Sequence, residues 1–263
     1  MKIQNLLLFL ICTLTFSVFA QNKPEILDNK VLYTKQYYSD FFKDNGKWAW
    51  EFDVVMRRQS ELGEANIFMH PLRFSIRPWI AFQYSKLARI SLNPIAMFHS
   101  TARFPLESDL NRLGERELRT TLQFVQSSFA GRVNFTHRLR FESRWRGIDE
   151  PNVKHNFRFR YRMRVRVPLN TNYFYTNHTL YLCAYSEFHT EFGRDYGSNF
   201  LSQSRNYIGL GFRFWDWTRV ELGYLHQYNT RSNNQQIDLS RGPMVYLFMD
   251  VLSRNKKRVS YSL

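Results

Sequence analysis

The sequence predicts an all-β protein: an antiparallel transmembrane β-barrel of about ten strands with an Arg- and Glu-lined lumen. Three features predict it, namely a two-residue alternation of apolar and cationic side chains, connections that alternate between short and long, and aromatic residues beside the short connections. The length of 263 residues is enough for one barrel. Charged residues make up 22% and hydrophobic residues 44% of the chain, which excludes wholesale disorder.

The first twenty residues have the layout of a secretory signal peptide. Lys2 supplies the positive start, an apolar stretch follows from Leu6 to Leu14, and Val18-Phe19-Ala20 resembles a cleavage site. We therefore expect residues 1–20 to be removed on export and the mature protein to lie in the outer membrane of a Gram-negative bacterium. Beyond this leader no apolar run is long enough for a membrane-spanning helix.

The formal net charge of +15 would suggest a nucleic-acid partner for a cytosolic protein, but the expected export excludes that partner. Of the two cysteines, Cys12 lies in the leader and Cys183 stands alone, which excludes an intramolecular disulfide and a cysteine-based metal cluster in the processed chain. The seven histidines show no metal-binding spacing. We expect no metal and no cofactor.

Two segments show the alternation most clearly. From Arg132 to Arg146, valine, phenylalanine, leucine and tryptophan fall mainly on one face, and arginines dominate the other. From Phe157 to Val167 every second residue is an arginine. Successive side chains of a strand point to opposite sides, so each segment has one apolar face and one cationic face.

The same pattern, followed along the chain, predicts strands at residues 48–58, 67–84, 88–101, 115–126, 131–146, 154–168, 173–188, 199–214, 217–229 and 236–251. Tight connections are predicted at residues 86–87, 129–131, 169–171 and 215–216, and longer ones at 102–114, 147–153, 189–198 and 230–235. The barrel then spans residues 46–252, and residues 253–263 form a C-terminal tail or a short last strand. Short turns on one side and longer loops on the other are typical of outer-membrane barrels, with the short turns periplasmic.

Alternation alone does not say which face is inside, because a soluble barrel would enclose the aromatics. Many predicted strands have 11 residues or more, enough to cross a bilayer when tilted. Aromatics also gather at the short turns, as in an interfacial girdle: Trp48, Trp50, Phe82, Tyr84, Tyr173, Tyr175, Phe214, Trp215 and Trp217. We therefore expect the arginines to line the lumen and the apolar face to contact outer-membrane lipid.

Two features depart from a regular barrel. Pro78 and Pro94 lie inside predicted strands, where a missing N–H predicts a bulge or kink. The N-terminal segment 21–45 contains a further stretch, Val31 to Phe42, which precedes a turn-like sequence and is a candidate eleventh strand. Bacterial barrels normally have an even number of strands. Either this stretch stays outside the wall, or Val259, Tyr261 and Leu263 belong to a twelfth strand.

Several short motifs resemble those of domain-of-unknown-function family 2490, a family of Gram-negative outer-membrane β-barrels, over most of residues 30–251. The motifs are Glu117-x-Arg119, Arg138-x-Arg140-x-Glu142-x-Arg144, Arg158-x-Arg160-Tyr161-Arg162, Pro168-Leu169, Glu187-Phe188, Gln203-x-Arg205, Gly209-Leu210-Gly211 and Glu221-x-Gly223-Tyr224. The resemblance implies a fold and a location but no activity. The chain departs from the family at Ser186 and at its last residue, Leu263.

Arginines outnumber acids on the predicted lumen face, and each acid there can sit between guanidiniums. We expect a charge lattice made of Glu117, Arg119, Arg138, Arg140, Glu142, Arg144, Arg158, Arg160, Arg162, Arg164, Glu187, Arg205 and Glu221. A structural or interaction barrel filled by this lattice is the first reading of its function. The alternative is a narrow anion-preferring channel or an anion-binding barrel with small anions in the lumen, because unpaired guanidiniums require water or anions.

A third reading, an outer-membrane hydrolase, has no triad spacing to support it. His137 and Ser143 share a face but are six residues apart on one strand, about 20 Å. His155 is interpreted as a residue at a loop end. We therefore expect no catalytic residues and no enzymatic activity, and the sequence identifies no protein partner.

Overall fold

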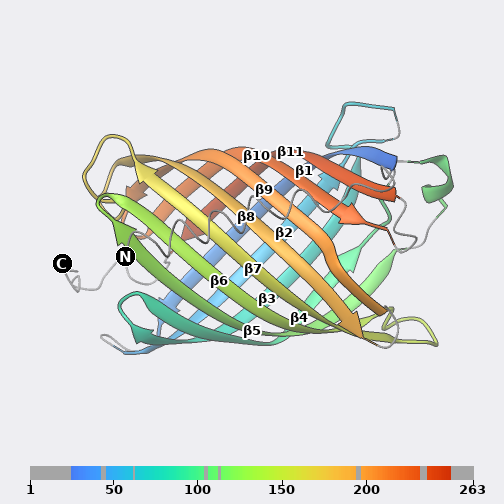
Figure 1. Cartoon of the computed structure of the whole chain (residues 1–263), viewed down its shortest axis with the longest axis horizontal. Coiled ribbons are helices and arrows are strands. Elements are labelled where there is room, and N and C mark those ends of the chain that lie inside the picture. Colours follow the sequence, from blue (N-terminus) through green and yellow to red (C-terminus); the bar gives the residue numbers. More distant parts are fainter. Residues whose placement is uncertain are drawn as a thin grey trace.

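The computed structural model describes residues 25–42, 46–61, 63–103, 106–111, 114–193, 197–231 and 236–249. The described residues form eleven strands that close into one barrel (Figure 1). In chain order the strands are β1 (Glu25–Phe41), β2 (Trp48–Gln59), β3 (His70–Ser85), β4 (Ala88–Ser100), β5 (Glu115–Ala130), β6 (Val133–Arg146), β7 (Lys154–Pro168), β8 (Thr179–Gly193), β9 (Gly197–Trp215), β10 (Thr218–Thr230) and β11 (Gln236–Met249). The predicted leader at 1–20 and the tail at 253–263 lie outside the described residues.

The all-β barrel is confirmed, but the predicted strand count and the purely antiparallel sheet are wrong. The predicted strands correspond to β2 to β11, and β1 is an additional member of the wall. It contains the Val31 to Phe42 stretch as far as Phe41, pairing with β2 on one side and β11 on the other. The described strands therefore close the barrel among themselves, and the alternative of a twelfth strand at Val259, Tyr261 and Leu263 lies outside the described residues.

The closure is a parallel pair because the number of strands is odd. Each strand runs antiparallel to its neighbour along the chain, so the first and the eleventh point the same way and must pair in parallel where they meet. The ladder between β1 and β11 skips from Lys30–Arg241 to Tyr33–Met244. At the gap Gly242 has φ +156°, and a Cβ there would lie 1.9 Å from the carbonyl oxygen of Val31. Only glycine lets the two backbones approach so closely.

The two prolines interrupt their ladders as predicted. Pairing between β3 and β4 breaks between Ile76 and Ile80, around Pro78, and pairing between β4 and β5 breaks between Asn93 and Ala96, around Pro94. Side chains satisfy the carbonyls left free there, because the Asn93 amide donates to the Pro78 oxygen and the Thr120 hydroxyl donates to the Pro94 oxygen at 2.8 Å. The missing N–H groups are thus accommodated without ending the strands.

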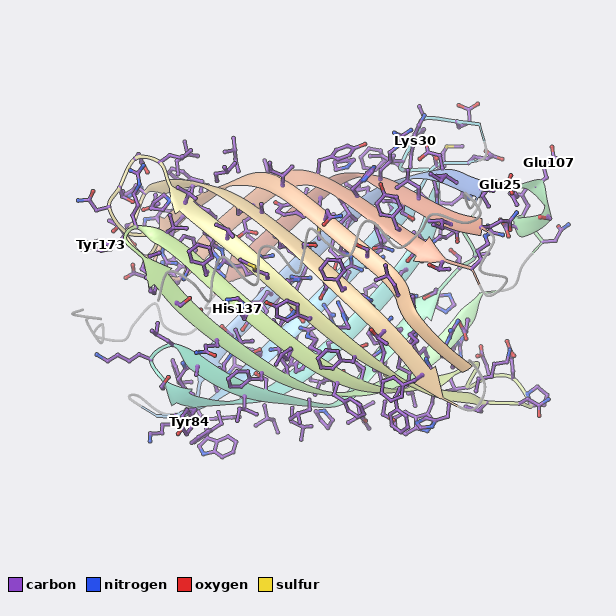
Figure 2. The ribbon with its side chains drawn as sticks, in the orientation of Figure 1. Glu25, Lys30, Tyr84, Glu107, His137 and Tyr173 are labelled. Atoms are coloured by element: carbon purple, nitrogen blue, oxygen red, sulfur yellow. The ribbon has the colours of Figure 1, made fainter. Side chains whose placement is uncertain are left out.

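The connections fall into two groups at opposite ends of the barrel. Two-residue turns at 86–87, 131–132 and 216–217 lie at one end, together with the connections after β1 and β7; we call this the short-turn end. The other end, the long-loop end, carries the connections after β2, β4, β6, β8 and β10, including the short 3-10 helix Glu107–Asp109. In Figure 2 the labelled Tyr84 and Tyr173 mark the short-turn end, and Glu25 and Glu107 mark the long-loop end.

Two predicted connections are wrong. The one after β7 covers 169–178 rather than 169–171, and β8 begins at Thr179 rather than at 173. Tyr173-Phe174-Tyr175 alternates like a strand, but Phe174 is buried against the Tyr181 ring (4.7 Å between centroids) instead. The predicted loop at 189–198 is mostly strand, because β8 continues to Gly193 and β9 starts at Gly197.

The arginines face inward and the apolar side chains face outward, as predicted. On β7, Arg158 and Arg160 are 5% exposed, whereas Phe159 between them is 41% exposed. The same contrast holds on other strands, where Leu122 and Leu210 are about half exposed. Arg132 is an exception: it lies exposed in the 131–132 turn rather than on the lumen face. No helix in the described part of the chain is long and apolar enough to cross a membrane.

Replacing Gly242 by alanine tests the parallel closure. Gly242→Ala is expected to lower the free energy of unfolding by about 2–5 kcal/mol, because the methyl group would collide with the Val31 carbonyl and the backbone angle would be strained. Urea unfolding of the protein in detergent micelles, followed by tryptophan fluorescence, measures this change. Gly131→Ala is the control, because its φ is also positive (+57°) but nothing lies within 4 Å of its added Cβ. Equal losses in the two variants would contradict the close approach.

Candidate functional site in the barrel lumen

The lumen brings together the residues of the predicted lattice. They lie on β5 to β10, and all of them are buried except Arg138, whose side chain is 13% exposed. Their inward orientation follows from the two-residue period of the strands, since each charged position alternates with an apolar one. The lattice has four carboxylate centres among the predicted residues: Glu187, Glu142, Glu117 and Glu221.

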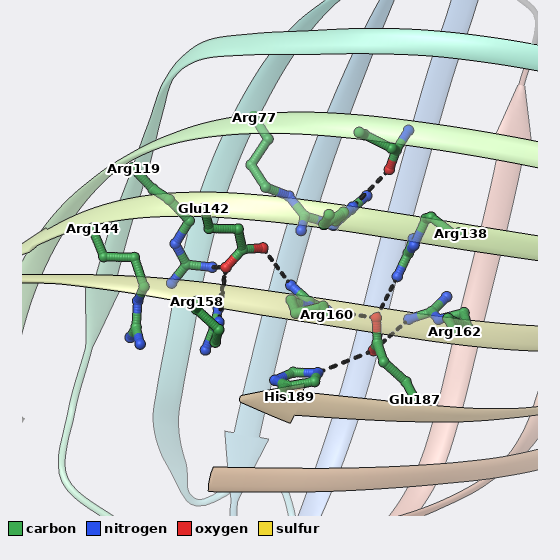
Figure 3. A network of polar contacts seen from close by, with 12 residues as sticks. Arg77, Arg119, Arg138, Glu142, Arg144, Arg158, Arg160, Arg162, Glu187 and His189 are labelled. Carbon is green, nitrogen blue, oxygen red and sulfur yellow. Dashed lines mark hydrogen bonds and ion pairs between the residues drawn. The ribbon is translucent and has the colours of Figure 1, made fainter. Parts of the chain in front are cut away.

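Glu187 on β8 has the most cationic partners of the four. Its Oε1 accepts from Arg138 at 2.6 Å and from Arg160 at 2.9 Å, and its Oε2 lies 2.9 Å from Arg162 and 3.3 Å from Arg205. His189 Nε2 is a further 3.5 Å neighbour. Figure 3 shows these side chains converging from three strands on the one carboxylate, while Arg205 approaches from β9.

Glu142 on β6 is the second centre and is joined to the first. It contacts Arg158 at 2.5 Å, Arg160 at 2.7 Å and Arg119 at 3.2 Å. Arg160 therefore spans the two carboxylates, with one terminal nitrogen on Glu142 and the other on Glu187. A guanidinium has its donors in a fixed fork, so this bridge sets the distance between β6 and β8 side chains across β7.

Glu117 extends the lattice toward the long-loop end. It accepts from Arg119 at 2.7 Å and from Arg144 at 2.6 Å. Arg144 also reaches Glu191 at 2.7 Å, a lumen residue that the sequence analysis missed. Glu191 follows Glu187 and His189 at a two-residue spacing on β8, so it lies on the same face of the strand. A predicted strand that extended beyond residue 188 would have included it.

Glu221 on β10 forms a looser centre. Arg164 and Arg166 lie 3.6 and 3.5 Å from its oxygens, and the Tyr181 hydroxyl donates to it at 3.0 Å. Tyr181 in turn covers Gly211, where a Cβ would lie 2.2 Å from its ring. The glycines of the Gly209-Leu210-Gly211 motif thus make room for buried tyrosine rings.

A second acidic group lies on β2, outside the predicted lattice, and two of its cationic partners, Lys35 and Arg89, were not predicted. Asp53 pairs with Lys35 at 2.7 Å and Arg77 at 3.1 Å, and Glu51 pairs with Arg89 at 2.5 Å. Lys35 belongs to β1, which was not counted among the ten strands. Lys35 shares the lumen face of β1 with Tyr33 and Tyr37, so this strand lacks the alternation of charged and apolar residues that marks β6 and β7.

The middle of the lumen is filled. Buried tyrosines from β1, β8, β9 and β11 pack there, with Tyr185 stacked on Tyr207 at 5.0 Å and the guanidinium of Arg162 over the Tyr185 ring at 4.0 Å. The cavity lined by Arg57, Arg119, Arg160 and their neighbours has a volume of only about 40 Å³. This is scarcely room for more than a water or two.

Ion pairs also tie down the long-loop end. Arg231, which directly follows β10, contacts Asp109 at 2.7 Å and Asp238 at 2.6 Å. Arg103 lies 3.5 Å from Asp238. Burial disfavours the charge of Arg231, but its hydrogen bonds to the two aspartates outweigh this effect and raise its pKa. The 3-10 helix of the β4–β5 connection is thereby held to the end of β10 and the beginning of β11.

The short-turn half of the lumen is hollow. A chamber of about 410 Å³ lies there, with Arg138, Arg140, Arg162, Arg164, Arg166 and Arg219 in its wall. Asp53 and Glu51 also line it, but each is paired with the β1, β3 or β4 cations described above. This volume is within the range of small-molecule sites.

Two of these arginines have no carboxylate partner within 4 Å among the described residues. Arg140 donates to the Gln123 amide oxygen at 2.6 Å and lies over the Trp79 ring, and Arg219 lies 4.0 Å over the Phe248 ring. The Nε atoms of Arg162, Arg164 and Arg219 are buried without a hydrogen-bond partner in the described structure. The chamber therefore has an excess of positive charge and of unused N–H donors.

The described residues contain no group of three or more His, Cys, Asp or Glu arranged to hold a metal ion. The positive lining of the chamber would also repel a cation. What the arrangement can hold, on chemical grounds, is an anion with several oxygen acceptors, because guanidiniums bind carboxylate and phosphate oxygens in pairs.

Removing the charge of Glu187 tests the lattice. Glu187→Gln is expected to lower the free energy of unfolding by about 3–5 kcal/mol, because the guanidiniums around it lose their shared counter-charge while they stay buried. Urea unfolding in micelles measures the change. Glu115→Gln is the matched control: Glu115 is 30% exposed and pairs with Arg146, so about 1 kcal/mol or less is expected. If the two variants unfold alike, the lattice does not stabilise the barrel.

Comparison with known proteins gave a match to a protein-family model. The family model described as "Protein of unknown function (DUF2490)" matches residues 32–238. This region runs from β1 to the beginning of β11 and includes every carboxylate centre of the lattice. Neither the curated proteins nor the solved structures contain a match to the chain.

Proposed function

The chain belongs to the DUF2490 family. From this membership and from the geometry of the lumen, we propose that the protein lies in the outer membrane of a Gram-negative bacterium and binds anions in the short-turn chamber. The observation that carries the proposal is the chamber of about 410 Å³ whose wall includes Arg140 and Arg219, two arginines without a carboxylate partner among the described residues.

The exterior of the barrel supports a membrane location. Its strands have 12 to 19 residues, enough to cross a bilayer when tilted. The outward side chains are largely apolar, and exposed aromatics gather at the short-turn end, where Trp48 packs on Phe82 and Trp215 stacks on Trp217. Such rings are favoured at the level of lipid headgroups. In this arrangement the chamber faces the periplasm.

The filled middle of the lumen favours binding over conduction. An anion-preferring channel requires a continuous wet path, whereas the lattice and the tyrosines pack closely at mid-barrel, around a cavity of about 40 Å³. A purely structural barrel accounts for the lattice, because nearly every acid there is paired. It does not account for the excess positive charge around the chamber, since a buried guanidinium without a counter-charge, such as that of Arg140, costs several kcal/mol unless water or an anion compensates it.

The location is tested by membrane fractionation of the native protein, followed by gel electrophoresis with and without heating. We expect the protein in the outer-membrane fraction, with a mobility that changes on boiling because a closed barrel resists detergent until it is heated. Recovery in the soluble fraction after high-speed centrifugation would contradict the location. The anion-binding test below is done in micelles and does not depend on that result.

Anion binding is tested by titrating the purified protein in a zwitterionic detergent with inorganic pyrophosphate in a calorimeter. Replacing Arg140 or Arg219 by glutamine is expected to weaken binding about tenfold or more, since a hydrogen bond to a charged group contributes about 1.5–3 kcal/mol. Arg116→Gln is the control, because that side chain is 62% exposed and lies outside the chamber. It is expected to leave binding unchanged.

Two results would contradict the anion-binding chamber. One is equal pyrophosphate affinity in wild type, Arg140→Gln and Arg219→Gln. The other is a steady anion current when the wild-type protein is inserted in a planar bilayer, because such a current needs an open path through the lattice.

A further inference from the structure

A serine and a histidine meet on the outer face of the barrel. Ser143 Oγ on β6 lies 2.8 Å from His155 Nε2 on β7. In the β6–β7 ladder Ser143 is opposite Phe157 and Trp145 is opposite His155, so the two side chains are diagonal neighbours on one face. Spacing along a single strand could not bring them together, but the register of two antiparallel strands does. The contact is within hydrogen-bond reach of a nucleophile and its general base.

The histidine ring is held by its neighbours. Its centroid lies 5.2 Å from the Trp145 ring and 4.8 Å from the Phe157 ring, which it meets edge to face. These contacts fix the plane of the imidazole and direct Nε2 at the serine. Ser143 and His155 are both partly exposed, so the pair is accessible from outside the barrel. Neither residue belongs to the charged lumen.

The surroundings of the pair are apolar and lie near the long-loop end. Ser143 is three residues from the end of β6 at Arg146, about 10 Å along the strand. Exposed rings flank it: Phe141 is 44%, Trp145 38% and Phe192 37% exposed. In the membrane location proposed above, this level corresponds to the boundary between hydrocarbon and headgroups, where the carboxylic esters of lipids lie.

From this geometry we infer that Ser143 and His155 form an acyl-transfer site for carboxylic esters of lipids. The Ser143 oxygen attacks the ester carbonyl carbon while its proton passes to His155 Nε2. The ester C–O bond then breaks, and His155 gives the proton to the departing alkoxide, which leaves as an alcohol. Water, deprotonated by His155, attacks the acyl-serine and releases a carboxylic acid and free Ser143. The lipid substrate rests on the proposed membrane location, and the serine–histidine chemistry is independent of the anion chamber.

A second histidine contact on the same face provides a comparison. His137 Nδ1 lies 2.8 Å from the Tyr161 hydroxyl, further along β6 and β7 toward the short-turn end. The hydroxyl in this contact is a phenol rather than a serine alcohol, so this pair offers a histidine base without the serine nucleophile. His137 therefore tests whether any outward histidine, or only His155, supports reaction.

The experiment is covalent labelling of the full-length protein in detergent micelles with an alkyl fluorophosphonate, followed by peptide mass spectrometry. We expect the label on Ser143, its loss in Ser143→Ala, and labelling at least about 100-fold slower in His155→Ala, since a general base contributes about 10²–10⁴-fold. Hydrolysis of a p-nitrophenyl fatty-acid ester should fall in the same order. Ser186→Ala and His137→Ala, which alter other outward side chains, are the controls and should match wild type.

Two outcomes would overturn the inference: labelling of Ser143 no faster than that of Ser186, or equal rates in wild type and His155→Ala. The heat-dependent gel shift of each variant confirms that it is folded, so a lost label reports chemistry rather than assembly. Membrane fractionation measures the location of the protein independently of the labelling. If Ser143 is labelled but the protein is not recovered with membranes, the serine–histidine pair is supported and the lipid substrate is refuted.

Discussion

The structure depends on enclosing rows of guanidiniums inside a closed sheet. The two-residue period of β6 and β7 places their arginines on one face, and burial makes each charge costly unless carboxylates share it. Because those carboxylates come from neighbouring strands, the ion pairs constrain the pairing between strands as well as the interior. A slip of one residue would turn the arginine rows outward and the rings inward. Glu142 and Glu187, joined through Arg160, therefore define the register of β6, β7 and β8.

Closure imposes a second constraint that is independent of charge. Eleven strands connected by hairpins must meet in one parallel pair, and parallel ladders have slanted bonds that do not continue an antiparallel pattern. The chain accommodates the mismatch at Gly242-Pro243, where the ladder skips and the backbones approach closely. The lattice on β5 to β10 lies away from this pair, so the irregular closure leaves the charge network intact. Lys35 is the one β1 cation named above that joins a carboxylate centre, through Asp53.

Much of the fold could be predicted from the sequence because the alternation is local. Each strand carries its own apolar and charged faces, so ten strands, the inward arginines and the lattice residues follow from short stretches. Three features depend on residues far apart in the sequence: how the barrel closes, which side chains meet across neighbouring strands, and which apolar side chains turn inward. The strand β1 was left uncertain because an even count was expected, Phe174 folds inward although its neighbours alternate like a strand, and Ser143 meets His155 only through the β6–β7 register.

The uneven placement of the acids divides the lumen into two parts. Glu117, Glu142 and Glu187 lie in the filled part and pair with the arginines around them, while Arg57 and Arg73 in the same part bond to Gln227 and Ser100. Toward the short turns the carboxylates are fewer or already paired, and the space is hollow. In the hollow part, guanidiniums without a carboxylate in contact repel one another and require solvent or anions between them. Arg140 sits at the boundary, lining both spaces and bonded only to an amide oxygen among the described side chains. The charge excess that leaves the chamber open is thus the same excess that would attract an anion into it.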